Sequence, residues 1–384
     1  MPEPSGKNIV VCSDGTGLSH VGATSNVLRL CELAVNDGGR QVACYDAGVG
    51  TGPSAGGTVV GRGVRRAAEL WLGLGVMDNV AELYVFLMRH YEPGDSIFLF
   101  GFSRGAFTVR ALAGLIHVCG LLPRNDQHLL SEAVGLYRTS EARIASTRRS
   151  KGLQPRVVST PGADHATFDE EARLFKSRAS RSCHVQFMGL WDTVKAYGWF
   201  WPQSFPVLRH NPSVRIVRHA VSLHERRSAF QVTGWGDRKP DVKEVWFRGD
   251  HSDVGGGYVA RSALSDATLG WMLGEATAAG LRIDQTHQHV LDALATRAAS
   301  ARACTPSNQR AGLFWAAECV PRFELDNGEY PPHRWPRFWP TGVRRPMRHR
   351  EGEALWLHET VTTEDTARMP SPFVWEATQP PLMT

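Results

Sequence analysis

Residues 101–105 read Gly-Phe-Ser-Arg-Gly and place a serine between two glycines. The pentapeptide follows the apolar run 97–100 and precedes a helix-like segment. Gly-x-Ser-x-Gly between a strand and a helix is typical of a nucleophile elbow, a sharp turn that lifts the serine hydroxyl above the end of a sheet. Side chains at Gly101 and Gly105 would crowd that turn. We therefore predict that Ser103 is a nucleophile, and a serine that only caps the helix is the alternative.

The sequence also offers an acid and a base in the order that such a turn requires. A serine hydroxyl is a weak nucleophile unless a base removes its proton and an acid orients that base. These partners follow later strands in the order Ser, Asp or Glu, His. Asp192 directly follows the apolar run 185–191, and His251 follows the run 242–247. We expect Asp192 to be the orienting acid and His251 to be the base.

Other assignments stay open at this point. Asp192 could be an ordinary strand-end or helix-capping aspartate, and His251 could be a structural histidine bonded within its own loop. His219 and His224 compete with His251 for the role of the base. A helix is predicted over residues 214–223, so these two histidines are less well placed to be the base than a histidine in a loop after a strand.

Acyl transfer also needs N–H donors that stabilise an oxyanion. One is expected to be the backbone N–H of Arg104, which follows the serine. The second is expected from the loop after the first apolar run, where Asp14, Gly15 and Thr16 are the candidates. Gly15 would let the backbone approach a ligand closely, and a plain turn is the alternative.

Aspartates at or near strand ends leave a metal-assisted reaction as an alternative. Asp14, Asp46 and Asp253 occupy such positions, and carboxylates suit hard cations. The preferred scheme uses no metal and no cofactor.

Short apolar runs alternate with helix-like segments along the chain, and this order must position the residues above. The run 96–100 shows no polar alternation, as expected for a strand covered on both faces. The alternation predicts an α/β fold, α/β-hydrolase-like, with a doubly wound, mostly parallel sheet. The predicted strands are 8–12, 41–45, 96–100, 185–190 and 242–247, and the predicted helices are 25–34, 78–91, 106–118, 214–223 and 265–279.

No convincing domain linker is present, so we expect a single domain over residues 1–384 with helical and loop insertions. Residues 122–182 are polar and arginine-rich, and they predict a mostly helical insertion that could form a cap. Residues 300–350 are rich in Pro, Trp and Arg and predict a second insertion.

Composition limits the class of protein and its surroundings. The net charge is +5 and 42% of the residues are hydrophobic, an ordinary globular mixture. Seven cysteines without a Cys-x-x-Cys pair indicate a reducing compartment. We expect neither a Sec signal peptide nor a transmembrane helix, because no suitable apolar segment occurs. The expected location is the cytoplasm, or export without a Sec signal, and the oligomeric state stays open.

The expected partner is an ester or lipid substrate rather than nucleic acid, for which no zinc-finger or homeodomain pattern is found. Tryptophans cluster at 199–202 and mix with arginines at 334–340, which suits the headgroup region of a membrane. Basic runs at 148–151 and 344–350 could add attraction to anionic lipid. Peripheral membrane contact is therefore one expectation. Packing of the tryptophans on the core, with solvated basic loops, is the other.

Several segments between residues 10 and 273 resemble, in this order, the DUF2235 α/β-hydrolase family. That family includes the catalytic domain of type VI secretion phospholipase effectors of the Tle1-like class. The segments are V-C-S-D-G-T-G, Y-D-A-G-V-G-T, G-F-S-R-G-A-F-T-V-R-A-L-A-G-L-I, G-L-W-D-T-V-K-A-Y-G, R-H-A-V-S-L-H-E-R-R, V-W-F-R-G-D-H-S-D-V-G-G-G-Y and L-S-D-A-T-L-G-W-M-L.

The resemblance implies an α/β-hydrolase fold with a Ser-Asp-His triad and, in the effector members, cleavage of phospholipid esters. Carried over by position, it supports Ser103 in G-F-S-R-G, Asp192 in W-D-T-V and His251 in D-H-S-D-V-G-G-G. This sequence departs from the family at His224, where an acidic residue often precedes E-R-R.

Residues and resemblance together predict a serine hydrolase that cleaves carboxylic esters through an acyl-enzyme, with phospholipids or other acyl lipids as the expected substrates. A non-catalytic binding protein on a hydrolase scaffold is the alternative from another class.

Overall fold

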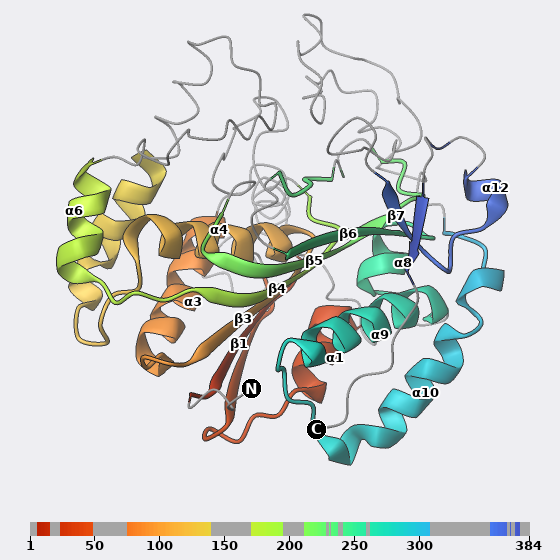
Figure 1. Ribbon diagram of the computed structural model, residues 1–384, viewed down its shortest axis with the longest axis horizontal. Helices are drawn as coiled ribbons and strands as arrows, with labels where there is room; N and C mark the ends of the chain where they lie inside the picture. Colours follow the sequence, from red (N-terminus) through yellow and green to blue (C-terminus); the bar gives the residue numbers. More distant parts are fainter. Residues whose placement is uncertain are drawn as a thin grey trace, which may run out of the picture.

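One sheet of eight parallel strands forms the centre of the computed structural model (Figure 1). The structure describes residues 6–15, 24–48, 75–139, 170–194, 211–227, 230, 232–236, 241–258, 262–307, 354–366, 369 and 373–376. The strands, in spatial order, are β2 (Gln41–Asp46), β1 (Asn8–Ser13), β3 (Ser96–Phe102), β4 (Val185–Trp191), β5 (Val214–Ser222), β6 (Asp241–Phe247), β7 (Leu355–His358) and β8 (Phe373–Glu376). The predicted α/β fold is confirmed, and every pairing of the described strands is parallel.

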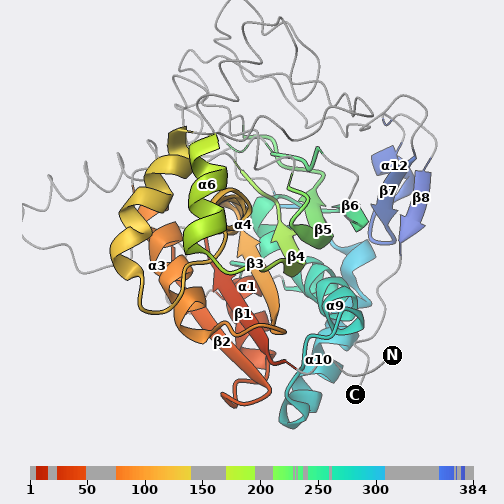
Figure 2. The same ribbon diagram turned by 60° about the vertical axis from the view of Figure 1, so that its left-hand side comes forward.

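Helices cover both faces of the sheet (Figures 1 and 2). Successive strand residues point to opposite faces, so on β1 Ile9 and Val11 join one core cluster and Val10 and Cys12 join the other. The first face carries α3 (Val76–His90), α4 (Arg104–Cys119) and α6 (Glu170–Ala179), and the second carries α1 (Asn26–Leu33), α9 (Ala263–Ala278) and α10 (Gln288–Ala298). None of these described helices is long and apolar enough to cross a membrane.

The strand order reverses between β1 and β3. From β1 the chain passes to β2 on one side and then returns to β3 on the other side of β1. In open parallel sheets a crevice forms at the carboxyl ends of the strands where the order reverses, and ligands bind there. The loop after β1 and the turn after β3 flank this point. The fold alone therefore predicts a ligand site near Asp14, Gly15 and Ser103.

The helix predicted over residues 214–223 is wrong, because this segment is strand β5. Its sequence V-R-I-V-R-H-A-V-S is rich in β-branched side chains, which lose rotamer freedom in a helix and pack well on a pleated surface. β5 also lies in the middle of the sheet, paired with both β4 and β6. His219 therefore lies on a central strand, and His224 lies just beyond its end.

Several predictions concern segments outside the described residues. They include the tryptophan-rich stretches 199–202 and 334–340, the basic runs 148–151 and 344–350, and most of the insertion 300–350. Of the insertion 122–182, the structure describes both ends, which contain helical residues 130–139 and α6. Its role as a cap stays a prediction.

Candidate active site

Ser103 occupies a strained turn between β3 and α4. Its φ of 58° and ψ of −119° lie in a region of backbone conformation that residues other than glycine rarely adopt. Strand β3 ends at Phe102 and helix α4 begins at Arg104, so no residue is left to relax the turn. Strain of this kind costs on the order of 1–3 kcal/mol and persists where the surrounding structure enforces it.

The two glycines of the motif permit the turn because other backbone lies against them. A Cβ on Gly105 would lie 2.0 Å from the carbonyl oxygen of Ser13, and a Cβ on Gly101 would lie 2.6 Å from Ala106 N. Neither neighbour is a flexible side chain that could move aside. The prediction that side chains at positions 101 and 105 would crowd the turn is therefore consistent with the backbone around Ser103.

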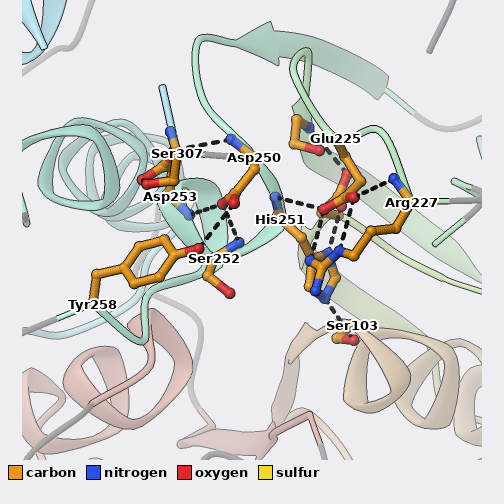
Figure 3. A network of polar contacts seen from close by, with 11 residues as sticks. Ser103, Glu225, Arg227, Asp250, His251, Ser252, Asp253, Tyr258 and Ser307 are labelled. Atoms are coloured by element: carbon orange, nitrogen blue, oxygen red, sulfur yellow. Dashed lines mark hydrogen bonds and ion pairs between the residues drawn. The ribbon is translucent and has the colours of Figure 1, made fainter. Parts of the chain in front are cut away.

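His251 lies opposite Ser103 at the start of the short helix α8 (His251–Gly255). The hydroxyl of Ser103 donates to His251 Nε2 at 2.8 Å (Figure 3). The helix start is fixed by a capping box, in which Asp250 accepts from the N–H of Asp253 and Asp253 accepts from the N–H of Asp250. Asp253 is thus a capping residue that helps to hold the loop that carries His251.

Asp192 holds the other side of the imidazole. Its Oδ2 lies 2.6 Å from His251 Nδ1, and its Oδ1 accepts from the N–H of Ser222 at 3.0 Å. Because a carboxylate only accepts, Nδ1 carries the ring proton and Nε2 is the acceptor that faces Ser103. Asp192 is fully buried and has a φ of 40°, a second strained residue at the end of a strand. The arrangement can move a proton from the serine hydroxyl to the histidine.

His219 and His224, the two competing histidines, serve other hydrogen bonds. His219 Nε2 accepts from the N–H of Thr193 at 3.1 Å, so its ring proton is on Nδ1, which faces Glu244 at 2.8 Å. His224 Nδ1 accepts from the N–H of Gly249, and its Nε2 lies 3.0 Å from Asp365. The first ring holds the turn after Asp192, and the second holds the loop before His251.

The loop after β1 lies beside Ser103. A Cβ on Gly15 would lie 3.5 Å from Ser103 Oγ, which shows how closely this backbone approaches the hydroxyl. The N–H of Gly15, however, donates to the carboxylate of Asp14 at 2.7 Å. Asp14 also accepts from Tyr45 Oη at 2.7 Å and from Ser25 Oγ. Gly15 thus shapes the loop with its N–H turned to Asp14, and Thr16 lies outside the described residues.

Arg104 contributes the first amide of α4, which points from the helix start toward the serine turn. Burial lowers the pKa of its guanidinium to about 10. The side chain thus keeps its positive charge at neutral pH. Burial raises the pKa of Asp14, which hydrogen bonds from Ser25, Tyr45 and Gly15 oppose.

The strand-end aspartates of the metal alternative each have protein partners. Asp46 accepts from Ser13 Oγ at 2.8 Å and from Asn79 Nδ2 at 2.9 Å, and Asp253 accepts from the N–H of Ser307 at 2.8 Å. Among the residues that the structure describes, no three His, Cys, Asp or Glu side chains form a group that could hold a metal ion.

Sequence reasoning missed the residues that surround the imidazole of His251. The ring of Phe102 lies 4.6 Å from it, and Phe230 meets it edge-on at 4.8 Å. Glu225 accepts from the N–H of His251 at 3.3 Å and is bound to Arg227. The segment E-R-R was part of the family resemblance, but nothing in the pattern predicted that it would reach His251.

Fold and site together define the class of this protein. A doubly wound parallel sheet with a strained serine turn at its reversal point, facing a histidine and an aspartate, is the architecture of α/β-hydrolase-like proteins. Residues 7–275 match the family described as T6SS, phospholipase effector Tle1-like, catalytic domain. The match covers well over half of the chain, so the chain belongs to this family. Membership supports hydrolysis of lipid esters in general terms.

Two further proteins are similar to this chain. Uncharacterized protein YEL023C of Saccharomyces cerevisiae is 34% identical over 240 residues, which cover 59% of this chain and 32% of that protein. The chain thus spans about a third of the length of that relative. A crystal structure of an uncharacterized protein from Pseudomonas aeruginosa has a TM-score of 0.39 and 19% identity, and the likeness covers 78% of this chain and 51% of that one.

Proposed function

We propose that the protein is a serine hydrolase that cleaves carboxylic esters of phospholipids or other acyl lipids through an acyl-enzyme. The observation that carries the proposal is the continuous hydrogen-bond chain from the Ser103 hydroxyl through His251 to Asp192. The family supplies the substrate class, because its members are described as phospholipase effectors.

The geometry supports the following reaction. Ser103 Oγ attacks the ester carbonyl while His251 Nε2 takes its proton, and Asp192 stabilises the imidazolium that forms. The tetrahedral intermediate collapses, the alcohol leaves with the proton from Nε2, and the acyl group stays on Oγ. A water molecule then attacks the acyl-enzyme, with the same histidine as its base, and releases the fatty acid.

The N–H of Arg104 is the proposed oxyanion donor on the helix side. Because the N–H of Gly15 is bonded to Asp14, the second donor is expected from the next amide along the loop, that of Thr16. Loss of one oxyanion donor typically costs about 3 kcal/mol of barrier.

The test is hydrolysis of phospholipid vesicles and of p-nitrophenyl esters of rising chain length by wild type and Ser103→Ala. We expect Ser103→Ala to lose about 10⁴-fold or more in kcat, because no other group can carry the acyl chain. A fluorophosphonate probe should label the wild type and not the variant. Ser177→Ala, which changes an exposed serine on α6, is the matched control and should keep full activity and labelling.

Each other outcome selects an alternative. Wild type that is folded, unlabelled and inactive on all esters would favour a non-catalytic binding protein. Activity that survives in Ser103→Ala but disappears on exhaustive chelation would favour a metal-assisted hydrolase.

A further inference from the structure

A buried ion pair lies directly beside the candidate base. Glu225 and Arg227 follow strand β5 and are 2% and 6% exposed. The Arg227 guanidinium donates to both carboxylate oxygens of Glu225, through Nε at 2.9 Å and Nη2 at 2.7 Å. The backbone N–H of Arg227 donates to the same carboxylate at 2.7 Å. Such a bidentate pair is geometrically rigid.

Each member of the pair contacts the surroundings of His251 by its own route, and Figure 3 shows the contact that Glu225 makes. Glu225 Oε2 accepts from the backbone N–H of His251 at 3.3 Å. The Arg227 guanidinium stacks on the ring of Phe230 at 3.8 Å, and that ring meets the imidazole edge-on at 4.8 Å. Phe102 lies on another side at 4.6 Å, so two aromatic rings pack against the imidazole that lies between Ser103 and Asp192.

The pair also determines the net charge near the imidazole. Burial lowers the pKa of Arg227, but the hydrogen bond and the charge of Glu225 more than offset this effect, and the pKa lies above its usual value. The guanidinium is therefore positive. Glu225 is held in its ionised form by N–H donors from Arg227 and His251. One negative and one positive charge thus compensate each other beside a histidine that must gain and lose a proton.

We propose that Glu225 and Arg227 are positioning residues, which hold the imidazole of His251 in line with Ser103 and balance the charge beside it. The inference rests on the proposed function, because it assumes that His251 is the base. It goes beyond that function, because neither residue touches the reacting atoms.

Other charged groups lie near His251 in the described part of the chain and set the background against which the pair acts. Asp192 contacts Nδ1 of the imidazole, Asp250 caps the helix that His251 begins, Arg104 follows Ser103, and Asp14 precedes Gly15, whose backbone lies close to Ser103. All of them are unchanged in the variants proposed below, so differences between variants report the pair alone.

The experiment measures the acid limb of the pH profile of kcat/KM on a p-nitrophenyl ester for three variants. In Glu225→Gln the guanidinium is uncompensated, which disfavours the imidazolium, so the limb should move to lower pH. In Arg227→Met the carboxylate is uncompensated, which favours the imidazolium, so the limb should move to higher pH. Each shift should be about one pH unit. The double variant Glu225→Gln/Arg227→Met has no net charge there, and its limb should return to the wild-type position although kcat falls.

Opposite shifts cannot come from a structural role alone, because loss of packing lowers the rate without a preferred direction in pH. Equal shifts in one direction, or unmoved limbs in folded variants, would overturn the proposal. Removal of one partner of a buried pair is destabilising, so circular dichroism accompanies each assay. If one single variant fails to fold, the other decides: a limb that moves in its stated direction supports the proposal, and an unmoved limb overturns it. If neither single variant folds, the pair has a structural role only and the proposal is overturned.

Glu275→Gln is the matched control. Glu275 is one of two carboxylate partners of Arg218, the other being Asp241, and it also pairs with Lys243. Arg218 lies on β5, four residues before the strand ends. Loss of this partly buried charge should leave the acid limb unmoved. Wild type and Ser103→Ala are assayed in parallel, and they separate the proposed function from the proposed role of the pair. A wild type without esterase activity contradicts the proposed function, whereas an active wild type whose limb none of the charge variants moves contradicts only the role of the pair.

Discussion

At the scale of single residues, two histidines with the same kind of partner at Nδ1 differ in their partner at Nε2. His251 and His219 both turn Nδ1 toward a carboxylate, at 2.6 Å and 2.8 Å. They differ at Nε2, which faces the hydroxyl of Ser103 in one ring and the backbone N–H of Thr193 in the other. A hydroxyl can give up its proton to the ring, whereas a backbone amide cannot. The partner of Nε2 therefore decides which histidine can be a base and which is structural.

Asp192→Asn tests this reasoning at the residue scale. The side-chain oxygen of asparagine can still accept from Ser222, and its NH₂ group then faces His251 Nδ1. The ring proton must move to Nε2, and a protonated Nε2 can no longer accept from Ser103. We expect kcat to fall by about 10³- to 10⁴-fold, with a smaller change in the free energy of unfolding by urea. A fall of less than tenfold would show that Asp192 does not determine the tautomer.

At the scale of elements, four elements pack closely around Ser103. The start of α4 packs on the end of β1 at Gly105, and α8 packs on the end of β3 at Gly255, where a Cβ would lie 2.0 Å from the ring of Phe102. Side chains at these points would push whole elements apart, because the opposing atoms are backbone or a buried ring. The glycines therefore maintain the distances between Ser103, His251 and the loop after β1.

Gly105→Ala and Gly135→Ala form a matched pair for this argument. Gly105 would place its Cβ 2.0 Å from Ser13 O, whereas Gly135, which is helical and exposed, would meet nothing within 4 Å. We expect Gly105→Ala to lose about 1–3 kcal/mol or more of unfolding free energy together with most of its esterase activity. Gly135→Ala should gain about 0.5–1 kcal/mol with unchanged activity. Urea denaturation and ester hydrolysis measure both, and equal stabilities would contradict the packing argument.

At the scale of the whole molecule, the sheet extends beyond the segment that matches the family. Strands β7 and β8 come from residues 355–376, after the match ends at residue 275. His358 joins this late part to the rest: its ring stacks on Phe247 of β6 at 4.2 Å, and it is fully buried. The stability of the fold therefore depends on a histidine that must stay neutral.

The pH dependence of stability follows from this burial. Burial lowers the pKa of His358 to about 3, below the value of about 6.5 in an unfolded chain. The unfolded state therefore binds the proton first, and the contribution of His358 is complete above about pH 6.5. Between pH 6.5 and 5 it should lose about 2 kcal/mol.

Urea unfolding of wild type and His358→Leu at several pH values measures this contribution. The wild type should lose about 2 kcal/mol more than the variant between pH 6.5 and 5. Burial also lowers the pKa of His224, His90 and His184, and they contribute equally to both proteins. Parallel curves for wild type and variant would show that His358 is not the source.

The sequence by itself determined what depends on near neighbours in the chain. The apolar runs predicted the parallel α/β sheet because a strand covered on both faces needs apolar side chains on both. The motif at residues 101–105 predicted the strained turn because the clash that Gly101 avoids, with Ala106, is local, although the clash that Gly105 avoids is with Ser13 of β1. The sequence-based prediction of a helix over residues 214–223 was wrong, because pairing with β4 and β6, which come from other parts of the chain, makes this segment a strand.

Only the tertiary structure decided which side chains face one another. Ser103 and His251 are 148 residues apart in the chain, and His251 and Asp192 are 59 apart. No local pattern could tell His251 from His219, turn the N–H of Gly15 toward Asp14, or bring Glu225 and Arg227 beside the imidazole. The physical reason is that these hydrogen bonds form between the ends of different strands, and their positions relative to one another exist only once the sheet is assembled.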